Sequence, residues 1–209
     1  MKIEHEYNIR YDKVTINTKG KRMKKILLAA LLLTTFGVSD VKEDIKSCNG
    51  GNMASCNKLG IGYGTGEKGF TLDSSKARVY FTKACNGGNL EGCANLGYSN
   101  IEEKNYFNAM KYFTKACDGG NAMGCGSLGI MHSRGDGTKK DLVKSVEYFT
   151  KGCDGGYALA CYKLGIGYYG GYAGRSQSFP KAKQLFKKAC KGGIPMACDK
   201  YDDMKKKGY

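Results

Sequence analysis

Four stretches of the chain share one helical pattern of apolar and polar positions. They are KARVYFTKAC (76–85), NAMKYFTKAC (108–117), KSVEYFTKGC (144–153) and KAKQLFKKAC (181–190). In the first stretch, Ala77, Tyr80, Phe81 and Ala84 fall at i, i+3, i+4 and i+7, which lie on one face of an α-helix. We term the predicted helices B helices. A residue type that commonly caps helices precedes each of them: Asp73, Asn105, Asp141 and Ser178.

Each B helix is followed by Gly-Gly and then by a second helical pattern. Glycine adopts the left-handed conformation of a C-terminal cap without steric cost, so Gly-Gly is expected to end the B helix. The segments that follow are CNKLGIGY (56–63), CANLGYSN (93–100), CGSLGIMH (125–132) and CYKLGIGY (161–168). They place Cys, Leu and Gly at offsets 0, 3 and 4, again on one helical face. We term these the A helices, and the pattern predicts an all-α chain of helix pairs.

The cysteines give the period of the array. All ten fall in five pairs that enclose the pattern C-x-G-G-x-x-x-x-C, and successive pairs are offset by 37, 32, 36 and 37 residues. A fixed period of 20–50 residues is typical of a solenoid. The first helix, at about 41–48, and the last, at about 195–207, depart from the pattern as capping elements of a repeat array do. The pairs are Cys48/Cys56, Cys85/Cys93, Cys117/Cys125, Cys153/Cys161 and Cys190/Cys198.

The spacing within a pair predicts a local disulfide. On one continuous helix, residues eight apart are separated by about 12 Å, whereas a disulfide tolerates Cα separations of about 4.4–6.8 Å. A break at Gly-Gly would fold the second cysteine back beside the first. Ten cysteines allow about 945 pairings, and only this one respects the repeat. Each closed loop of nine residues would contribute roughly 2.5 kcal/mol by the chain-entropy estimate.

Residues 1–39 carry the pattern of an N-terminal extension and signal peptide. After the basic Met23-Lys24-Lys25, residues 26–38 form an apolar run of thirteen residues. This run is shorter than the ~20 residues of a membrane span and fits the apolar region of a signal peptide. We predict that translation starts at Met23 and that cleavage follows Ser39. The alternative is an uncleaved membrane anchor; after cleavage, no stable membrane insertion is expected.

Residues 40–209 then form one repeat domain with few aliphatic side chains. Leu, Ile, Val and Phe make up 26 of its 170 residues, and 26 Lys and Arg stand against 16 Asp and Glu. Such a composition normally indicates disorder, but disulfides formed in an oxidising compartment would compensate. We therefore expect a secreted or periplasmic protein. The charge favours anionic partners such as cell-wall polymers or acidic proteins, or it is a solvated basic surface; export argues against nucleic acid.

The motifs resemble a known family. L-G-x-x-Y from Leu59, D-x-x-K-A from Asp73 and Y-F-x-K-A-C from Tyr80 resemble the Sel1-like repeat, a relative of the tetratricopeptide repeat. The cysteine pair in every copy is similar to that of the Helicobacter cysteine-rich proteins. Over residues 40–207, the resemblance implies a right-handed superhelix of helix pairs with one disulfide per repeat. It also implies either an adaptor role in protein complexes or slow β-lactam hydrolysis by a penicillin-binding protein. Asn100 and His132 replace the tyrosine of the motif.

The chain offers few groups for catalysis. Residues 40–209 contain one histidine and no H-x-x-x-H or C-x-x-C spacing, so we predict no metal site, no redox site and no cofactor. Ser55 to Lys58 matches the S-x-x-K element of serine β-lactamases, but Ser55 is expected in the turn before the A helix, and the accompanying S-D-N and K-T-G elements are missing. The catalytic residues of a β-lactamase are therefore not assigned.

Binding is the main functional prediction. A solenoid presents an extended concave surface, normally lined by its A helices, on which a peptide can lie. Positions off the core face of these helices could hydrogen-bond a ligand, or they are plain solvated positions. They are Asn57, Lys58, Asn95, Ser127, Tyr162 and Lys163. We predict an exported scaffold that binds proteins, peptides or cell-wall ligands such as peptidoglycan fragments, with a slow β-lactamase as the alternative.

Overall fold

The computed structural model describes residues 41–67, 69–171 and 176–209, and within these ranges all regular structure is helical. Residues 41–49 form the first helix. The helices that follow are α2 (Met53–Thr65), α3 (Ser74–Asn86), α4 (Leu90–Glu102), α5 (Tyr106–Asp118), α6 (Ala122–Arg134), α7 (Leu142–Asp154), α8 (Ala158–Gly170), α9 (Phe179–Lys191) and α10 (Pro195–Lys206). The predicted all-α fold of helix pairs is confirmed. The predicted signal peptide lies outside the described residues.

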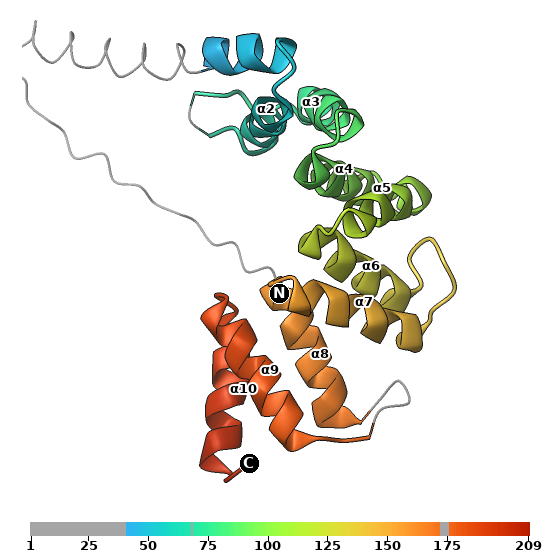
Figure 1. The fold of residues 1–209 in the computed structure, drawn as a ribbon, viewed down its shortest axis with the longest axis vertical. Helices are drawn as coiled ribbons and strands as arrows, with labels where there is room; N and C mark the ends of the chain where they lie inside the picture. Colours follow the sequence, from blue (N-terminus) through green and yellow to red (C-terminus); the bar gives the residue numbers. More distant parts are fainter. Residues whose placement is uncertain (1–40, 68, 172–175) are drawn as a thin grey trace, which may run out of the picture.

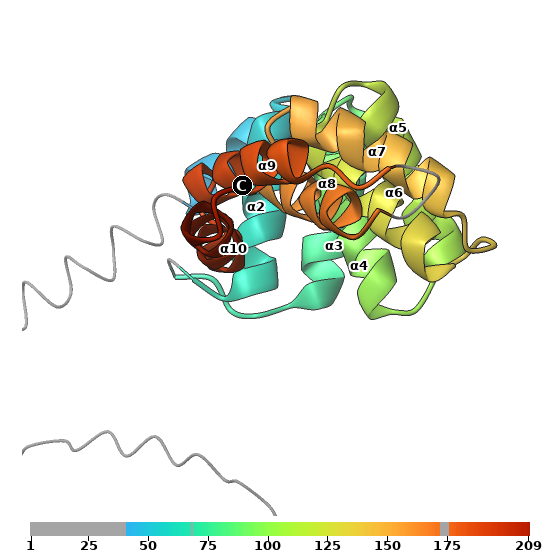
Figure 2. The ribbon, with the colours of Figure 1, turned by 90° about the horizontal axis from the view of Figure 1, so that it is seen from below.

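The helices stack in chain order into one curved array (Figure 1). Each helix packs against the helix before it and the helix after it, and the A helices α2, α4, α6 and α8 also contact one another in succession. These additional contacts place the A helices on the inner side of the curve. In the view from below, the helices overlap along the array, and the C-terminal helices α9 and α10 lie in the foreground (Figure 2).

The B helix boundaries follow the predicted signals, with one exception. The second glycine of every Gly-Gly pair has a positive φ of 87–95°, the left-handed geometry that ends each B helix. The side chains of Asp73, Asn105 and Asp141 accept hydrogen bonds from first-turn amides of α3, α5 and α7. Ser178 is the N-cap residue of α9 as predicted, but the hydrogen bond expected from its side chain is absent.

The A helices begin earlier than the quoted pattern, which starts at the cysteine. Cys56 is the fourth residue of α2, which starts at Met53, and Ser55 therefore lies within the helix rather than in the turn where it was expected. The reason is a cap that the sequence analysis missed, since the Asn52 side chain accepts a hydrogen bond from the Ser55 amide. Asparagine caps two other A helices in the same way, at Asn89 and Asn121.

All five predicted disulfides are formed. They are Cys48–Cys56, Cys85–Cys93, Cys117–Cys125, Cys153–Cys161 and Cys190–Cys198. Their Cα–Cα distances are 4.4–4.8 Å, at the short end of the range for disulfides, because the turn at Gly-Gly folds each A helix back on the preceding helix. The first four disulfides are buried, and Cys48 and Cys56 are fully so, whereas Cys190–Cys198 is partly exposed. The disulfide-linked helix hairpin inferred from the cysteine spacing is confirmed.

A glycine of each A helix receives a phenylalanine of the following B helix. A Cβ atom added to Gly60, Gly97, Gly129 and Gly165 would lie 2.5, 2.6, 2.6 and 2.8 Å from ring atoms of Phe81, Phe113, Phe149 and Phe186. Real Cβ atoms essentially never come closer than 3.0 Å to such neighbours. The glycine of the recurring Leu-Gly pair therefore lets the two helices approach closely.

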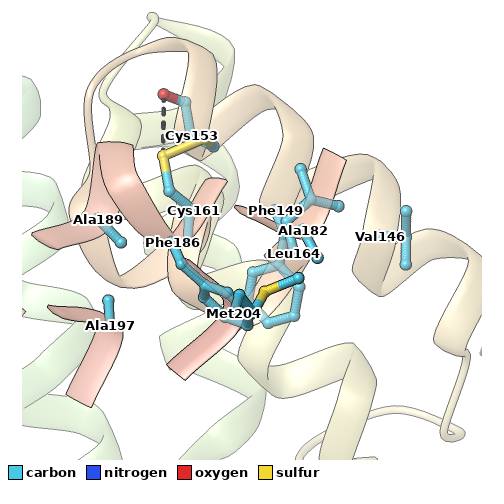
Figure 3. Packing of buried hydrophobic residues seen from close by; sticks show 11 residues of the cluster. Val146, Phe149, Cys153, Cys161, Leu164, Ala182, Phe186, Ala189, Ala197 and Met204 are labelled. Carbon is cyan, nitrogen blue, oxygen red and sulfur yellow. Dashed lines mark hydrogen bonds between the residues drawn. A yellow bond between two sulfur atoms is a disulfide. The ribbon is translucent and has the colours of Figure 1, made fainter. Parts of the chain in front are cut away.

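The core is thin and divided among successive hairpins. Four clusters of buried side chains follow one another along the array, and each contains a disulfide and at least one buried Phe or Leu. Figure 3 shows the C-terminal cluster, in which Leu164 of α8, Phe186 of α9 and Met204 of α10 lie together near the Cys153–Cys161 disulfide. Each hairpin thus buries its apolar face only by stacking on its neighbours.

Candidate ligand-binding groove

Polar side chains join successive A helices on the inner side of the curve. Asn95 Nδ2 of α4 donates a hydrogen bond to Asn57 Oδ1 of α2 at 2.9 Å. One interval further along, the hydroxyl groups of Tyr98 on α4 and Ser127 on α6 lie 2.7 Å apart, and the Tyr157 hydroxyl is 3.4 Å from that of Tyr98. These bonds tie the A helices to one another and use the polar atoms of several residues predicted to contact a ligand.

A groove of about 490 Å³ lies beside this row, between α2 and α4, with α3 as its floor. A volume of this size is typical of a small-ligand or short-peptide site. Its apolar lining includes Ile61, which is 40% exposed, and Phe81 and Tyr98. The complete lining is Ile61, Gly64, Thr65, Ser74, Ala77, Arg78, Phe81, Asn95, Tyr98, Ser99, Glu102 and Glu103.

Charged groups stand at one end of the groove, where α4 ends. The Arg78 guanidinium of α3 forms an ion pair with the Glu103 carboxylate. Glu102 is exposed and makes no hydrogen bond or ion pair within the described residues. The lining therefore carries two carboxylates and one guanidinium, although the whole chain has a formal net charge of +15.

The equivalent space between α4 and α6 is much smaller. It measures about 150 Å³ and is lined by residues that include Tyr98, Phe113, Ser127 and Arg134. Counted from the cysteine of the A helix, Tyr98 stands where the first interval has Ile61. Because the tyrosine reaches across to Ser127, it fills the space that the shorter isoleucine leaves open. The first interval thus offers more room than the second.

The six predicted ligand residues lie in different environments. Asn57 and Ser127 are only 4% and 3% exposed and are bonded to neighbouring A helices. Among the six, only Asn95 lines the large groove. The Lys58 ammonium forms an ion pair with Asp44 at 2.8 Å.

The other two of the six lie on α8. Tyr162 is half-buried against Phe186, and Lys163 is exposed. Ligand contact at all six positions stays a prediction. The charged groups of the groove were missed, and the signal that could have indicated them is the adjacent Glu102-Glu103 in the shortened second repeat.

Two lysines of the basic surface have a role within the fold. Lys115 Nζ donates to the backbone oxygen of Cys85 at 2.9 Å, and Lys188 Nζ donates to that of Cys153 at 2.6 Å. Both carbonyls lie at the C-terminal end of the preceding B helix, where the helix dipole favours a cation. Part of the positive charge is therefore explained without an anionic partner.

The serine and lysine of the S-x-x-K match each bond to a residue of the first helix. Ser55 Oγ donates to Ser47 Oγ at 2.9 Å, while Lys58 pairs with Asp44. Cys56, which lies between them in the sequence, is held in the disulfide with Cys48 and offers no thiol. Within the described residues, no group of three or more His, Cys, Asp or Glu side chains is placed to hold a metal ion, and no cysteine is free.

The hydroxyl groups of Ser127 and Tyr98 are close enough for proton transfer, so we considered whether a base could activate Ser127. Burial and the hydrogen bond with Tyr98 raise the pKa of the neighbouring Tyr157 well above its ordinary value. A phenol with a raised pKa stays protonated at neutral pH and is a poor general base. The hydroxyl contacts of Tyr98 with Ser127 and Tyr157 therefore serve to join α4 to the neighbouring helices.

His132 occupies the position of the motif tyrosine and packs in the same way. Its ring stacks on Tyr148 at a centroid distance of 5.3 Å, as Tyr63 stacks on Tyr80 at 5.6 Å. The side chain is 6% exposed and its Nδ1 atom has no hydrogen-bond partner among the described residues. Burial, with a contribution from Lys144, lowers the pKa of His132 below 6.5. His132 is thus a neutral packing residue at neutral pH.

The family assignment rests on four consecutive matches to the Sel1 repeat, at residues 54–89, 90–121, 122–157 and 158–194. The chain belongs to the Sel1 repeat family. Each matched repeat holds one A helix and the following B helix, so each central disulfide, such as Cys85–Cys93, joins one Sel1 repeat to the next. No curated protein sequence matches the chain.

Solved structures show the same fold. A protective antigen of uropathogenic Escherichia coli with an SLR fold matches with a TM-score of 0.72 and 25% identity, over 80% of this chain and 36% of the antigen. A Sel1 repeat protein from Oxalobacter formigenes matches with a TM-score of 0.71 and 23% identity, over 77% of this chain and 65% of that protein. This Sel1 repeat chain thus spans about a third of the length of the antigen and just under two thirds of the length of the Oxalobacter protein.

One of the similar solved structures is a cysteine-rich protein. Cysteine rich protein B of Helicobacter pylori is 32% identical over 61% of this Sel1 repeat chain and 94% of that protein, with a TM-score of 0.49. Five disulfides are typical of an oxidising compartment outside the cytoplasm. Among the described helices, none has the length and apolar character needed to cross a bilayer.

Proposed function

We propose that this Sel1 repeat protein is an exported scaffold that binds a protein or peptide ligand in the groove between α2, α3 and α4. The observation that carries the proposal is a 490 Å³ groove on the inner side of the array, with apolar walls and charged groups at one end. Ligand sites commonly combine a mostly apolar lining with a few placed polar groups. An extended concave surface is also how repeat arrays generally bind their partners.

The covalent frame supports binding by a rigid surface. Cys85–Cys93 fixes the start of α4 against the end of α3, and the Asn95–Asn57 hydrogen bond joins α4 to α2. A site whose walls are held in place loses less conformational entropy when a ligand binds. The groove is therefore suited to binding even though the core of each hairpin is small.

The proposal includes export. The mature protein would be residues 40–209, after removal of the extension and signal peptide over residues 1–39. An oxidising destination, secreted or periplasmic, would allow all ten cysteines to pair. Slow hydrolysis of β-lactams stays a prediction of the resemblance to the cysteine-rich proteins. The S-x-x-K match does not support it, since Lys58 pairs with Asp44.

The test replaces a small residue of the groove with the larger residue that occupies the equivalent position in the next repeat. Ser99 lines the groove and is replaced at the equivalent position of α6 by Met131. Ser99→Met is expected to occupy the groove, whereas Ser99→Ala leaves it open. Peptides selected from a random library on oxidised residues 40–209 should bind the wild type and Ser99→Ala equally. They should lose at least about tenfold in affinity for Ser99→Met.

Two results would refute the assignment of the groove. One is a selection that enriches no binding peptide from a library of adequate diversity. The other is a set of selected peptides whose affinities for Ser99→Met equal those for the wild type, since these peptides would bind elsewhere. Circular dichroism and an intact-mass measurement would verify that both variants keep their helices and disulfides.

A further inference from the structure

We propose that the α2–α3–α4 groove is selective for a cationic side chain, a lysine or arginine of an extended peptide, next to an apolar residue. The inference rests on the proposed function, because it names the ligand chemistry of the same groove. It runs against the overall charge of the chain, which by itself favours anionic partners. Three features of the groove support it: its carboxylates, its helix ends and its apolar wall.

The carboxylates leave a local negative charge. Arg78 is the cation of the lining, and its guanidinium is paired with Glu103. Glu102 remains without a hydrogen bond or ion pair among the described residues, and it is exposed at the mouth of the groove. An incoming ammonium or guanidinium group can pair with Glu102 without breaking a contact. A carboxylate would meet Glu102 and would have to compete with Glu103 for Arg78.

The helix ends add to this field. The groove is lined by Thr65 at the C-terminal end of α2 and by Glu102 at the C-terminal end of α4. The last carbonyl groups of a helix carry partial negative charge and favour cations. The N-terminal end of α3 also reaches the groove at Ser74, but the Asp73 carboxylate caps it. Two helix C-termini and one capped N-terminus thus favour positive charge.

The apolar wall suits the stem of such a side chain and a neighbouring apolar residue. Ile61 and Phe81 line the groove, Gly64 has no side chain to obstruct it, and Ser99 contributes only a hydroxymethyl group. Lysine and arginine bury their methylene stems against apolar surface while the charged head stays at a polar rim. The groove provides both parts, with the rim formed by Glu102 and Glu103.

The next interval shows that this combination is not a general property of the repeat. Nine residues after the cysteine of the A helix, α4 has Glu102 and α6 has Arg134. The lining of the smaller space between α4 and α6 includes Arg134 and Asp136, so it carries one guanidinium for its one carboxylate. Negative charge and sufficient volume coincide in the first of these two intervals.

The experiment compares three blocked tripeptides that differ only in the central side chain. The probes are N-acetyl-Ile-Xaa-Phe-amide with arginine, citrulline or glutamate at Xaa, and binding is followed by NMR shifts of the groove amides in oxidised residues 40–209. Citrulline keeps the shape of arginine without its charge. The arginine peptide is expected to bind most tightly, and Glu102→Gln should weaken it by about three- to fivefold. The same substitution should leave the citrulline peptide unchanged.

Glu91→Gln is the matched control. Glu91 is an exposed glutamate in the first turn of the same helix and does not line the groove, so its substitution should change neither affinity. The inference is overturned if citrulline or glutamate peptides bind as tightly as the arginine peptide, or if Glu102→Gln weakens the arginine and citrulline peptides equally. It is also overturned if none of the probes shifts the groove amides. The Ser99→Met test of the proposed function does not depend on these results, so failure of the inference and failure of the proposed function can be told apart.

Discussion

The contact between Gly97 and Phe113 allows a prediction whose sign depends on packing rather than on helix propensity. In a helix interior, alanine is more favourable than glycine by about 1 kcal/mol. A Cβ atom on Gly97, however, would lie 2.6 and 2.7 Å from Cε1 and Cδ1 of the Phe113 ring. Phe113 is 1% exposed, so displacing its ring would disturb the side chains packed around it. Overpacking of this kind costs about 1–3 kcal/mol.

We therefore expect Gly97→Ala to lower the free energy of unfolding by up to about 2 kcal/mol, since the clash of about 1–3 kcal/mol outweighs the gain in propensity of about 1 kcal/mol. Gly167, in the interior of α8, is the matched control. Among the residues that the structure describes, a Cβ atom added there would meet no atom within 4 Å, so Gly167→Ala should raise the free energy of unfolding by up to about 1 kcal/mol. Urea unfolding of the oxidised protein, followed by circular dichroism, measures both changes.

A second variant makes the explanation refutable. Phe113→Leu removes the ring that meets Gly97, so Gly97→Ala should be much less destabilising in that background than in the wild type. If Gly97→Ala stabilises the protein as much as Gly167→Ala does, the glycine is not required by the phenylalanine. If its cost is the same in the Phe113→Leu background, the cost does not come from the ring. Either result would refute the packing reason given for the Leu-Gly motif.

Two further predictions concern the disulfides and the pH dependence of stability. Because Cys190–Cys198 is partly exposed while the other four disulfides are buried, mild reduction followed by alkylation should label these two cysteines first. Equal labelling of all ten in peptide mass spectra would show that burial does not control access. The lowered pKa of His132 means that the unfolded chain takes up a proton at a higher pH than the folded protein. The free energy of unfolding should therefore be fully retained above pH 6.5 and decrease as the pH falls below 6.5 towards the folded-state pKa. His132→Tyr, which restores the residue found at Tyr63, should remove this contribution; an equal pH dependence of the melting temperature in both proteins would contradict it.

Local covalent geometry explains why the helix hairpins and their disulfides could be predicted from the sequence. Two cysteines eight residues apart around Gly-Gly can pair only if the chain reverses there, so one motif determined a helix end, a turn and a disulfide. Cys117–Cys125, with the left-handed Gly120 between them, follows this reasoning directly. The caps at Asp73 and Asp141 could likewise be predicted because they depend on residues within one turn. Nothing in the structure explains why Ser178 makes no cap bond.

The inner surface was harder to predict because it depends on contacts between helices that are not consecutive. Asn57 and Ser127 lie off the core face of their own helices, and a single helix would leave them in solvent. In the array, the next or the preceding A helix covers them, and their polar atoms bond to Asn95 and Tyr98. Whether an interval stays open depends on how far one side chain, Ile61 or Tyr98, reaches across to its neighbour. The pattern of a single repeat does not contain that information.

The position of the disulfides relative to the Sel1 repeats connects the fold to the groove. In a repeat array, stability is approximately the sum of terms within repeats and terms between neighbouring repeats. Cys85 lies in the repeat at 54–89 and Cys93 in the repeat at 90–121, so this disulfide strengthens an interface between repeats. The groove spans the same interface, because its floor and one wall belong to the first repeat and its other wall, α4, belongs to the second. The bond that offsets a small core at this junction is therefore also the bond that holds the walls of the proposed binding site together.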